Sequence, residues 1–209
     1  MNILIADDHA IVREGVKQIV RSLPEVKLIE EVSDGNEAFL KICSTDYDLV
    51  ILDISMPGMS GLDVLQRMKD RNINTHVLIF SFYPQEQYAI RAFKLGASGY
   101  LSKDSAYDEL TTAIRKIAAG GKYVSAALAE RLIFQDPGMN EKEPHESLSE
   151  REFQIMIQLS KGKSVTEIAR ALFLSDKTVS TYRTRIMDKM NLKTNADLTR
   201  YALRNKLIE

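Results

Sequence analysis

Short apolar runs alternate with longer amphipathic segments through the first 120 residues of this chain. Each run is too short for a helix and almost entirely apolar, which is typical of strands buried on both faces of a parallel sheet. The segments between them place apolar residues three or four apart, the spacing of one helix face. Five such repeats predict an α/β doubly wound, five-stranded parallel sheet with helices on both faces. The predicted strands are Ile3–Ala6, Val26–Ile29, Leu49–Leu52, Val77–Phe80 and Gly99–Leu101.

From Ser147 onward the apolar spacing is that of helices alone. Ser149 and Glu152 predict a capping box at the start of the first helix, and Gly162 follows its end. The other predicted helices span 165–172, 176–190 with Ser175 or Asp176 as the cap, and 195–206. These four short helices predict a small all-α domain.

The two patterns divide the chain into three parts. We expect a first domain at 1–120, a linker at 121–146 and the helical domain at 147–209. The linker carries Pro, Gly and charged residues, which favour a flexible segment, after a short predicted helix at 125–133.

Charge is divided unevenly along the chain. Residues 1–120 hold 13 Lys and Arg against 17 Asp and Glu, a net charge of −4. Residues 148–209 hold 12 against 7, a net charge of +5. A basic second domain suggests that it faces a polyanion. Charge alone leaves open the alternative that this basic face is merely solvated.

Composition argues against several classes of protein. The chain has no run of about 18 apolar residues, so we expect no membrane span. Its N-terminus lacks the features of a signal peptide, and Cys43 is the one cysteine, so a reducing cytoplasm is expected. We expect Cys43 to be a small buried hydrophobe on a helix. His9, His76 and His145 lack the spacing of zinc ligands, so no zinc site is predicted.

Acidic and basic side chains follow the predicted strands where each one ends. Asp7 and Asp8 follow the first strand, and Asp53 follows the third. Ser81 ends the fourth strand, and Lys103 comes shortly after the fifth. Because the carboxyl ends of parallel strands meet at one edge of the sheet, we expect these side chains to share a site. Read alone, an Asp-Asp pair would more simply be a helix cap or a solvated turn.

Three neighbouring carboxylates cannot all stay ionised without a cation. Mg²⁺ is the natural choice, since it prefers carboxylates, waters and phosphate oxygens. Lys103 adds a point charge suited to a phosphoryl oxygen, and Ser81 adds a hydrogen-bond donor. An aspartate in such a site can attack phosphorus and form an aspartyl phosphate, and Asp53 is central in the predicted sheet.

The segments IADDHAIVREG, LVILDISMPGMSGLDVL and GASGYLSK, with the strand end at Ser81, resemble the receiver domain of bacterial two-component response regulators. The resemblance covers residues 2 to about 119. It implies a flavodoxin-like fold with strand order 2-1-3-4-5. It also implies that Asp53 accepts a phosphoryl group from a sensor histidine kinase.

The same resemblance assigns roles to the residues of the site. Its implied Mg²⁺ ligands are Asp8, Asp53 and the backbone carbonyl of Ser55, with Asp7 acting through a water. Its implied phosphoryl contacts are Ser81 and Lys103, with Tyr100 as a switch that turns inward when Ser81 moves, and Ser55 and Tyr83 as positions that tune the lifetime of the phosphate. One departure is Asp104, which stands where relatives often have a cis proline. A cis bond before a non-proline residue costs about 2.5–4 kcal/mol, so either the loop is strained, or the bond is trans and Lys103 is placed differently.

The helices at 165–172 and 176–190 fit a helix-turn-helix unit, whose longer helix enters the major groove of DNA. With Val179, Tyr182, Ile186 and Met190 in the core, hydroxyl and basic side chains face outward to read bases or hold phosphates. The predicted DNA contacts are Lys177, Thr178, Ser180, Thr181, Thr184, Arg185 and Lys189. A helical bundle that docks on protein is the alternative.

Residues 145 to about 207 strongly resemble the LuxR-type DNA-binding domain, and the two halves together resemble a response regulator of the NarL/FixJ type. The resemblance implies a transcription factor switched by phosphorylation, with double-stranded DNA as partner, a homodimer when active, and RNA polymerase as a further candidate partner. A regulator that binds DNA without phosphorylation is an alternative. A magnesium-dependent phosphatase is another, but no separate general acid is evident beside Asp53, so we do not expect an enzyme.

Overall fold

The computed structural model describes residues 1–83, 85–105, 107–125, 129, 143–205 and 207–208. The chain forms two compact units, Met1–Gln135 and Asp136–Glu209, and each is described by itself. The predicted helix at 125–133 and most of the predicted linker lie outside the described residues. Among the helices described, none is long and apolar enough to cross a membrane.

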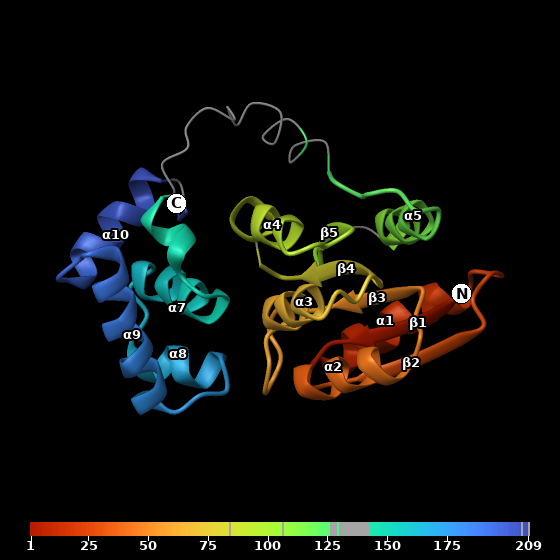
Figure 1. Ribbon diagram of the computed structural model, residues 1–209, viewed down its shortest axis with the longest axis horizontal. Helices are drawn as coiled ribbons and strands as arrows, with labels where there is room; N and C mark the ends of the chain where they lie inside the picture. Colours follow the sequence, from red (N-terminus) through yellow and green to blue (C-terminus); the bar gives the residue numbers. More distant parts are fainter. Residues whose placement is uncertain (84, 106, 126–128, 130–142, 206, 209) are drawn as a thin grey trace. The chain divides into compact units, whose positions relative to one another are not determined.

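The first unit is a five-stranded, all-parallel sheet with the order β2-β1-β3-β4-β5, which confirms the predicted fold (Figure 1). Its strands are β1 (Asn2–Ala6), β2 (Leu28–Val32), β3 (Leu49–Leu52), β4 (His76–Ser81) and β5 (Gly99–Ser102). Its helices are α1 (Ala10–Arg21), α2 (Gly35–Ser44), α3 (Gly61–Asp70), α4 (Gln85–Lys94) and α5 (Tyr107–Ala118).

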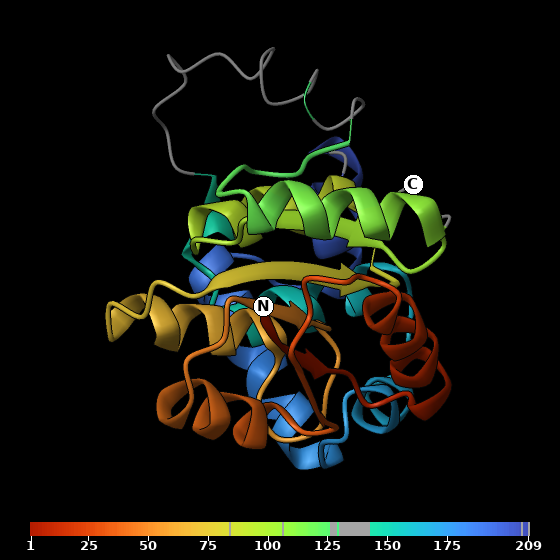
Figure 2. The same cartoon turned by 90° about the vertical axis from the view of Figure 1, so that its right-hand side faces the viewer.

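Helices cover both faces of this sheet. Helices α1 and α5, red and green in Figure 2, contact each other and pack with Ile5 and Ile51 into one buried cluster. Alternate strand residues such as Leu4 and Val50 are fully buried outside this cluster, and α2 packs on β1 while α4 packs on β5. All four residues of β3 are buried. The strand that leads into Asp53 is therefore the rigid centre of the unit.

The predicted position of the second strand was wrong. Strand β2 lies at Leu28–Val32, not at 26–29, and it is only partly buried. As an edge strand it accommodates Glu30 and Glu31, which form ion pairs with Lys41 and Lys17, each at 2.9 Å. These charges hid the strand from a search for apolar runs.

Cys43 was predicted to be buried and is exposed. Helix α2 turns Ala38, Phe39 and Ile42 toward the core, and Cys43 follows this stripe by one residue. A step of one residue rotates the side chain by about 100° on a helix of 3.6 residues per turn, which moves it off the buried face.

The second unit contains a short 3₁₀ helix and four α-helices. They are η1 (Pro144–Ser147), α7 (Glu150–Ser160), α8 (Val165–Ala171), α9 (Asp176–Met190) and α10 (Asn195–Arg204). The capping box of Ser149 and Glu152 is present, and Ser175 rather than Asp176 caps α9. The last helix ends at Arg204, two residues before its predicted end, and η1 lies across the end of the predicted linker.

Gly61 brings α3 against the loop that carries Asp53. Its backbone N–H donates to the carbonyl of Ile54 at 3.0 Å. A Cβ atom at this position would lie 2.1 Å from the backbone oxygen of Asp53, a distance that no packed carbon tolerates. The absence of a side chain at Gly61 therefore allows the close approach that shapes this loop.

Gly61→Ala should lower the free energy of unfolding by about 1–3 kcal/mol, because backbone atoms must shift to admit the methyl group. Urea denaturation with a linear extrapolation measures this change. Gly15→Ala is the matched control, since nothing lies within 4 Å of the added Cβ on helix α1. That control should raise stability by about 0.5–1 kcal/mol. Equal effects of the two substitutions would contradict the assignment.

Candidate functional site

Backbone hydrogen bonds continue past the strand ends and fix where the site residues begin. The N–H of Asp7 donates to Val32 at 3.1 Å, and the N–H of Asp53 donates to Ala6 at 2.8 Å. The N–H of Lys103 donates to the carbonyl of Ser81 at 3.0 Å. The sheet therefore fixes the backbone of these three residues, and their side chains start from the same edge of the sheet.

Lys103 bridges two buried carboxylates. Its Nζ lies 2.6 Å from Oδ2 of Asp7 and 2.8 Å from Oδ2 of Asp53, and its side chain is 1% exposed. No cis peptide occurs in the described part of the chain, so the bond to Asp104 is trans. The bond is trans, but the expectation that a trans bond would place Lys103 differently was wrong, since Lys103 reaches both Asp7 and Asp53.

Asp53 is held in a strongly charged environment. Burial raises the pKa of its carboxyl, the Lys103 ammonium lowers it, and the Asp7 carboxylate raises it again, so that the net shift of the pKa is upward. Its Oδ1 accepts a hydrogen bond from the N–H of Ile54 at 2.7 Å. The ionised form of Asp53 is therefore disfavoured until further positive charge is supplied.

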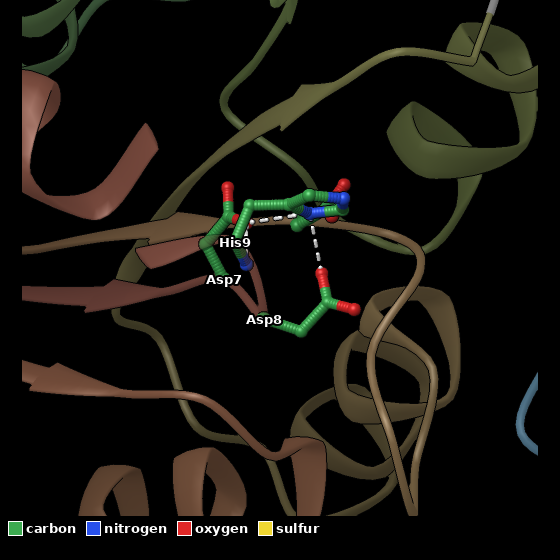
Figure 3. A group of neighbouring side chains, drawn as sticks. Asp7, Asp8 and His9 are labelled. Carbon is green, nitrogen blue, oxygen red and sulfur yellow. Dashed lines mark hydrogen bonds and ion pairs between the residues drawn. The ribbon is translucent and has the colours of Figure 1, made fainter. Parts of the chain in front are cut away.

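His9 joins this group of acids, although the sequence pattern gave it no role (Figure 3). Its Nδ1 lies 2.7 Å from Oδ1 of Asp8 and 3.3 Å from Oδ1 of Asp7. The sequence did contain a sign of this contact, because His9 directly follows the two acids at the end of the strand and therefore lies in the same turn. Asp7 also accepts a hydrogen bond from the N–H of His9 at 2.9 Å.

The donor atoms suit a divalent cation. One ligand atom from each of Asp7, Asp8, His9 and Asp53 lies within 4.8 Å of the others. Oδ1 of Asp8 is buried and forms no hydrogen bond within the described residues, so its contact with His9 is an ion-pair distance without directed geometry. A buried carboxylate oxygen without a hydrogen bond is a strong attractor for a cation. Carboxylate oxygens are the donors that Mg²⁺ prefers.

The remaining site residues named from the sequence differ in burial. Ser81 is buried and its side chain hydrogen-bonds Asp53, and Ser55, two residues after Asp53, is partly buried. Tyr100 is fully buried, and its hydroxyl donates to the carbonyl of Tyr83 at 2.7 Å. The aromatic ring of Tyr100 thus points inward.

Helix α9 presents the predicted DNA-facing residues at the surface. Val179, Ile186 and Met190 are buried as predicted, and Met187 is also buried. Tyr182, which was also predicted for the core, is only partly buried. Exposed are Lys177, Ser180, Thr181, Thr184, Arg185 and Lys189, while Thr178 is partly buried beside the cap residue Ser175. The turn before α9 contains Phe173 with φ 54, a left-handed backbone that bulky residues seldom adopt.

Some of the basic side chains on α9 also have structural partners. Nζ of Lys189 lies 2.7 Å from Oε2 of Glu152, which ties α9 to the capping box of α7. Nε of Arg183 donates to the side chain of Asn195 at 2.9 Å, which ties α9 to α10. Lys177 lies in the first turn of α9 and is exposed. It is therefore better placed than Lys189 to meet an external anion.

Two protein families match this chain. Residues 3–115 match the response regulator receiver domain, and residues 146–202 match the bacterial regulatory proteins of the luxR family. Both matches fall on the folds and motifs described above.

Several relatives match this chain over nearly its whole length. The chain is 35% identical to the response regulator UvrY of Escherichia coli, over 99% of this chain and 95% of that protein. It is 36% identical to the oxygen regulatory protein NreC of Staphylococcus epidermidis, over the full length of both. A structure of the Salmonella typhimurium response regulator RcsB shares the fold, with a TM-score of 0.62 at 24% identity over 97% of this chain and 99% of that chain. The protein belongs to the NarL/FixJ-type response regulators, a family of DNA-binding transcriptional regulators that join a receiver domain to a LuxR-type helix-turn-helix domain.

Proposed function

We propose that phosphorylation of Asp53 by a sensor histidine kinase controls dimerisation and DNA binding by this transcriptional regulator. The observation that carries the proposal is the Lys103 ammonium, held 2.8 Å from Oδ2 of Asp53 in a buried pocket. An oxygen of Asp53 attacks phosphorus, the bond from phosphorus to the histidine nitrogen breaks, and that nitrogen keeps the electron pair and takes up a proton. Lys103 then neutralises charge on the transferred group.

The residues around Asp53 divide the remaining tasks. Asp8, Asp53 and the backbone carbonyl of Ser55 would hold Mg²⁺, and Asp7 would hold it through a water. The cation supplies positive charge for the transferred phosphoryl oxygens. Ser81 donates a hydrogen bond to one of these oxygens, and Lys103 contacts another. Tyr100, buried in β5, is the residue through which the pocket reports its state to α4 and β5.

The second unit delivers the output. The active protein is a homodimer in the cytoplasm that binds two half-sites of double-stranded DNA about one helical turn apart. RNA polymerase is a further partner. Helix α9 lies in the major groove, and the DNA-contacting residues on it are Lys177, Thr178, Ser180, Thr181, Thr184, Arg185 and Lys189.

A specific observation favours a second candidate function, a regulator that binds DNA without phosphorylation. Lys103 bridges Asp7 and Asp53 within the buried pocket, at 2.6 Å and 2.8 Å. These ion pairs give the acidic residues a structural role that needs no phosphate. The two functions differ in what Asp53 contributes in the cell, and a single substitution separates them.

Asp53→Ala should abolish labelling by a ³²P-phosphodonor in the presence of Mg²⁺, because the attacking oxygen is gone. Autoradiography measures the label. Asp46→Ala is the control, since Asp46 is exposed and precedes β3, away from the carboxyl ends of the strands. Label that persists in Asp53→Ala would contradict the assignment of the phosphoacceptor. Promoter activity that is unchanged in Asp53→Ala cells would favour the regulator that needs no phosphate.

Lys177→Ala should weaken operator binding by about 1 kcal/mol or more and reduce the dependence of log Kd on log salt by about one phosphate contact. Thr181→Ala should also weaken binding, with less change in salt dependence. Fluorescence anisotropy across a salt series measures both. Lys193→Ala is the control, since Lys193 is an exposed lysine of the same unit that lies outside α9. If both α9 variants kept full affinity, the assigned DNA face would be wrong.

Asp53→Asn should stabilise the protein against urea at neutral pH without divalent cations, because the ionised carboxylate is buried at a cost. The pKa of Asp53 is raised on folding. The contribution of Asp53 to the free energy of unfolding is therefore fully present below its unfolded pKa of about 3.9, where the carboxyl is protonated in both states. That contribution is lost as pH rises through the raised folded pKa. The advantage of Asp53→Asn should therefore shrink as pH falls. Asp104→Asn, which removes a carboxylate at an exposed position, is the control for the substitution itself.

A further inference from the structure

The side chains of the pocket lie in two layers. The inner layer is almost closed to solvent: the side chains of Lys103, Asp53 and Asp7 are 1%, 3% and 4% exposed. The outer layer consists of two aromatic rings, with His9 at 53% and Phe82 at 54% exposed. Charged groups thus lie beneath rings that face outward.

Phe82 lies over the bridging lysine. Nζ of Lys103 is 5.1 Å from the centroid of the Phe82 ring, within the range of a cation–π contact. Phe82 directly follows Ser81 at the end of β4, so the sheet fixes where its backbone lies. A half-exposed phenylalanine in this place covers the ammonium that the transferred phosphoryl group must reach.

His9 completes the cover on the side of the acids. Its ring meets the Phe82 ring edge to face, with centroids 6.1 Å apart and planes at 78°. Its Nδ1 is held by Oδ1 of Asp8 at 2.7 Å (Figure 3). The two rings therefore support each other, and each contacts a charged group of the pocket.

We propose that the rings of His9 and Phe82 form a lid over the pocket, and that this lid limits the access of water and of small phosphodonors to Asp53. This inference rests on the proposed phosphorylation of Asp53. In hydrolysis, a water oxygen bonds to phosphorus while the bond from phosphorus to Asp53 breaks and the carboxylate keeps the electron pair; the proton of the water passes to the released phosphate. Both uptake and hydrolysis require a nucleophile or donor in line with the bond that breaks, and both therefore require an open lid.

Asp8 links the lid to the cation. Its Oδ1 is close to the imidazole in this structure and is also an oxygen that would ligate Mg²⁺. A cation at Asp8 would compete with the His9 ring for this oxygen. Ligation of a cation by Asp8 would then weaken the contact that places the His9 ring, and with it the edge contact to Phe82. Loading of the site would thus loosen the lid.

Phe82→Ala should raise the rate of labelling by acetyl phosphate and the rate of loss of the phosphoryl group, each by about two- to fivefold. That factor corresponds to about 0.4–1 kcal/mol at 25 °C. His9→Ala should act in the same direction on both rates. Labelling time courses, followed by removal of donor and a chase in Mg²⁺ buffer, measure them with the full-length protein.

Phe173→Ala is the matched control, since Phe173 is 59% exposed and lies in the second unit. Its rates should equal those of wild type. A labelled wild type whose two rates are unchanged by Phe82→Ala and by His9→Ala overturns the lid alone. A wild type that takes up no phosphoryl group, from this donor or from a kinase, overturns the proposed function and the lid with it.

A tryptophan probe tests the link to the cation without any phosphoryl chemistry. The chain contains no tryptophan, so Phe82→Trp supplies a single emitter at the lid. Addition of Mg²⁺ alone should shift its emission, and Phe173→Trp in the second unit should not respond. An emission from Phe82→Trp that ignores Mg²⁺, under conditions where Mg²⁺ supports labelling, overturns the release of His9 by cation binding.

Discussion

The placement of Lys103 between Asp7 and Asp53 is the constraint around which the pocket of the receiver unit is built. Both carboxylates and the ammonium are nearly closed to solvent. Burial of charges costs several kcal/mol per ion, and only close partners offset that cost. Three acids and one lysine do not balance, so the pocket keeps an excess of negative charge. That imbalance costs stability, and it makes the pocket receptive to a cation and, after the cation, to phosphate.

The fold supplies the precision that such a pocket requires. Asp53 follows a strand with every residue buried, and Gly61 lets the next helix approach the backbone of Asp53 so closely that a methyl group has no room. Lys103 reaches the same point from the end of β5, and the peptide bond that follows it, to Asp104, is trans. The geometry of the pocket is therefore set by the sheet edge, where the two loops are anchored by strand hydrogen bonds, and does not depend on a cis bond.

Much of this arrangement was predictable because parallel topology converts sequence order into spatial order. Once five apolar runs are recognised as parallel strands, the residues that follow them must share an edge, which placed Asp7, Asp53 and Lys103 together. The failures have physical causes. Glu30 and Glu31 are tolerated in β2 because an edge strand is partly solvated and lysines neutralise them. His9 was missed because a ring held by its sequence neighbours leaves no periodic signal.

The bridging Lys103 bears on how such a regulator can be switched. A phosphoryl group shifts an equilibrium only as far as it binds one state more tightly than the other. Such differential contacts come first from the groups that would meet the phosphoryl oxygens, and Lys103, held 2.8 Å from Oδ2 of Asp53 and 2.6 Å from Oδ2 of Asp7, is foremost among them. A phosphoryl group that took Lys103 away from Asp7 would disturb the loop before α1, where Arg13 also bonds the backbone oxygen of Asp7 at 2.6 Å. A change that began at Asp7 would therefore reach α1 directly.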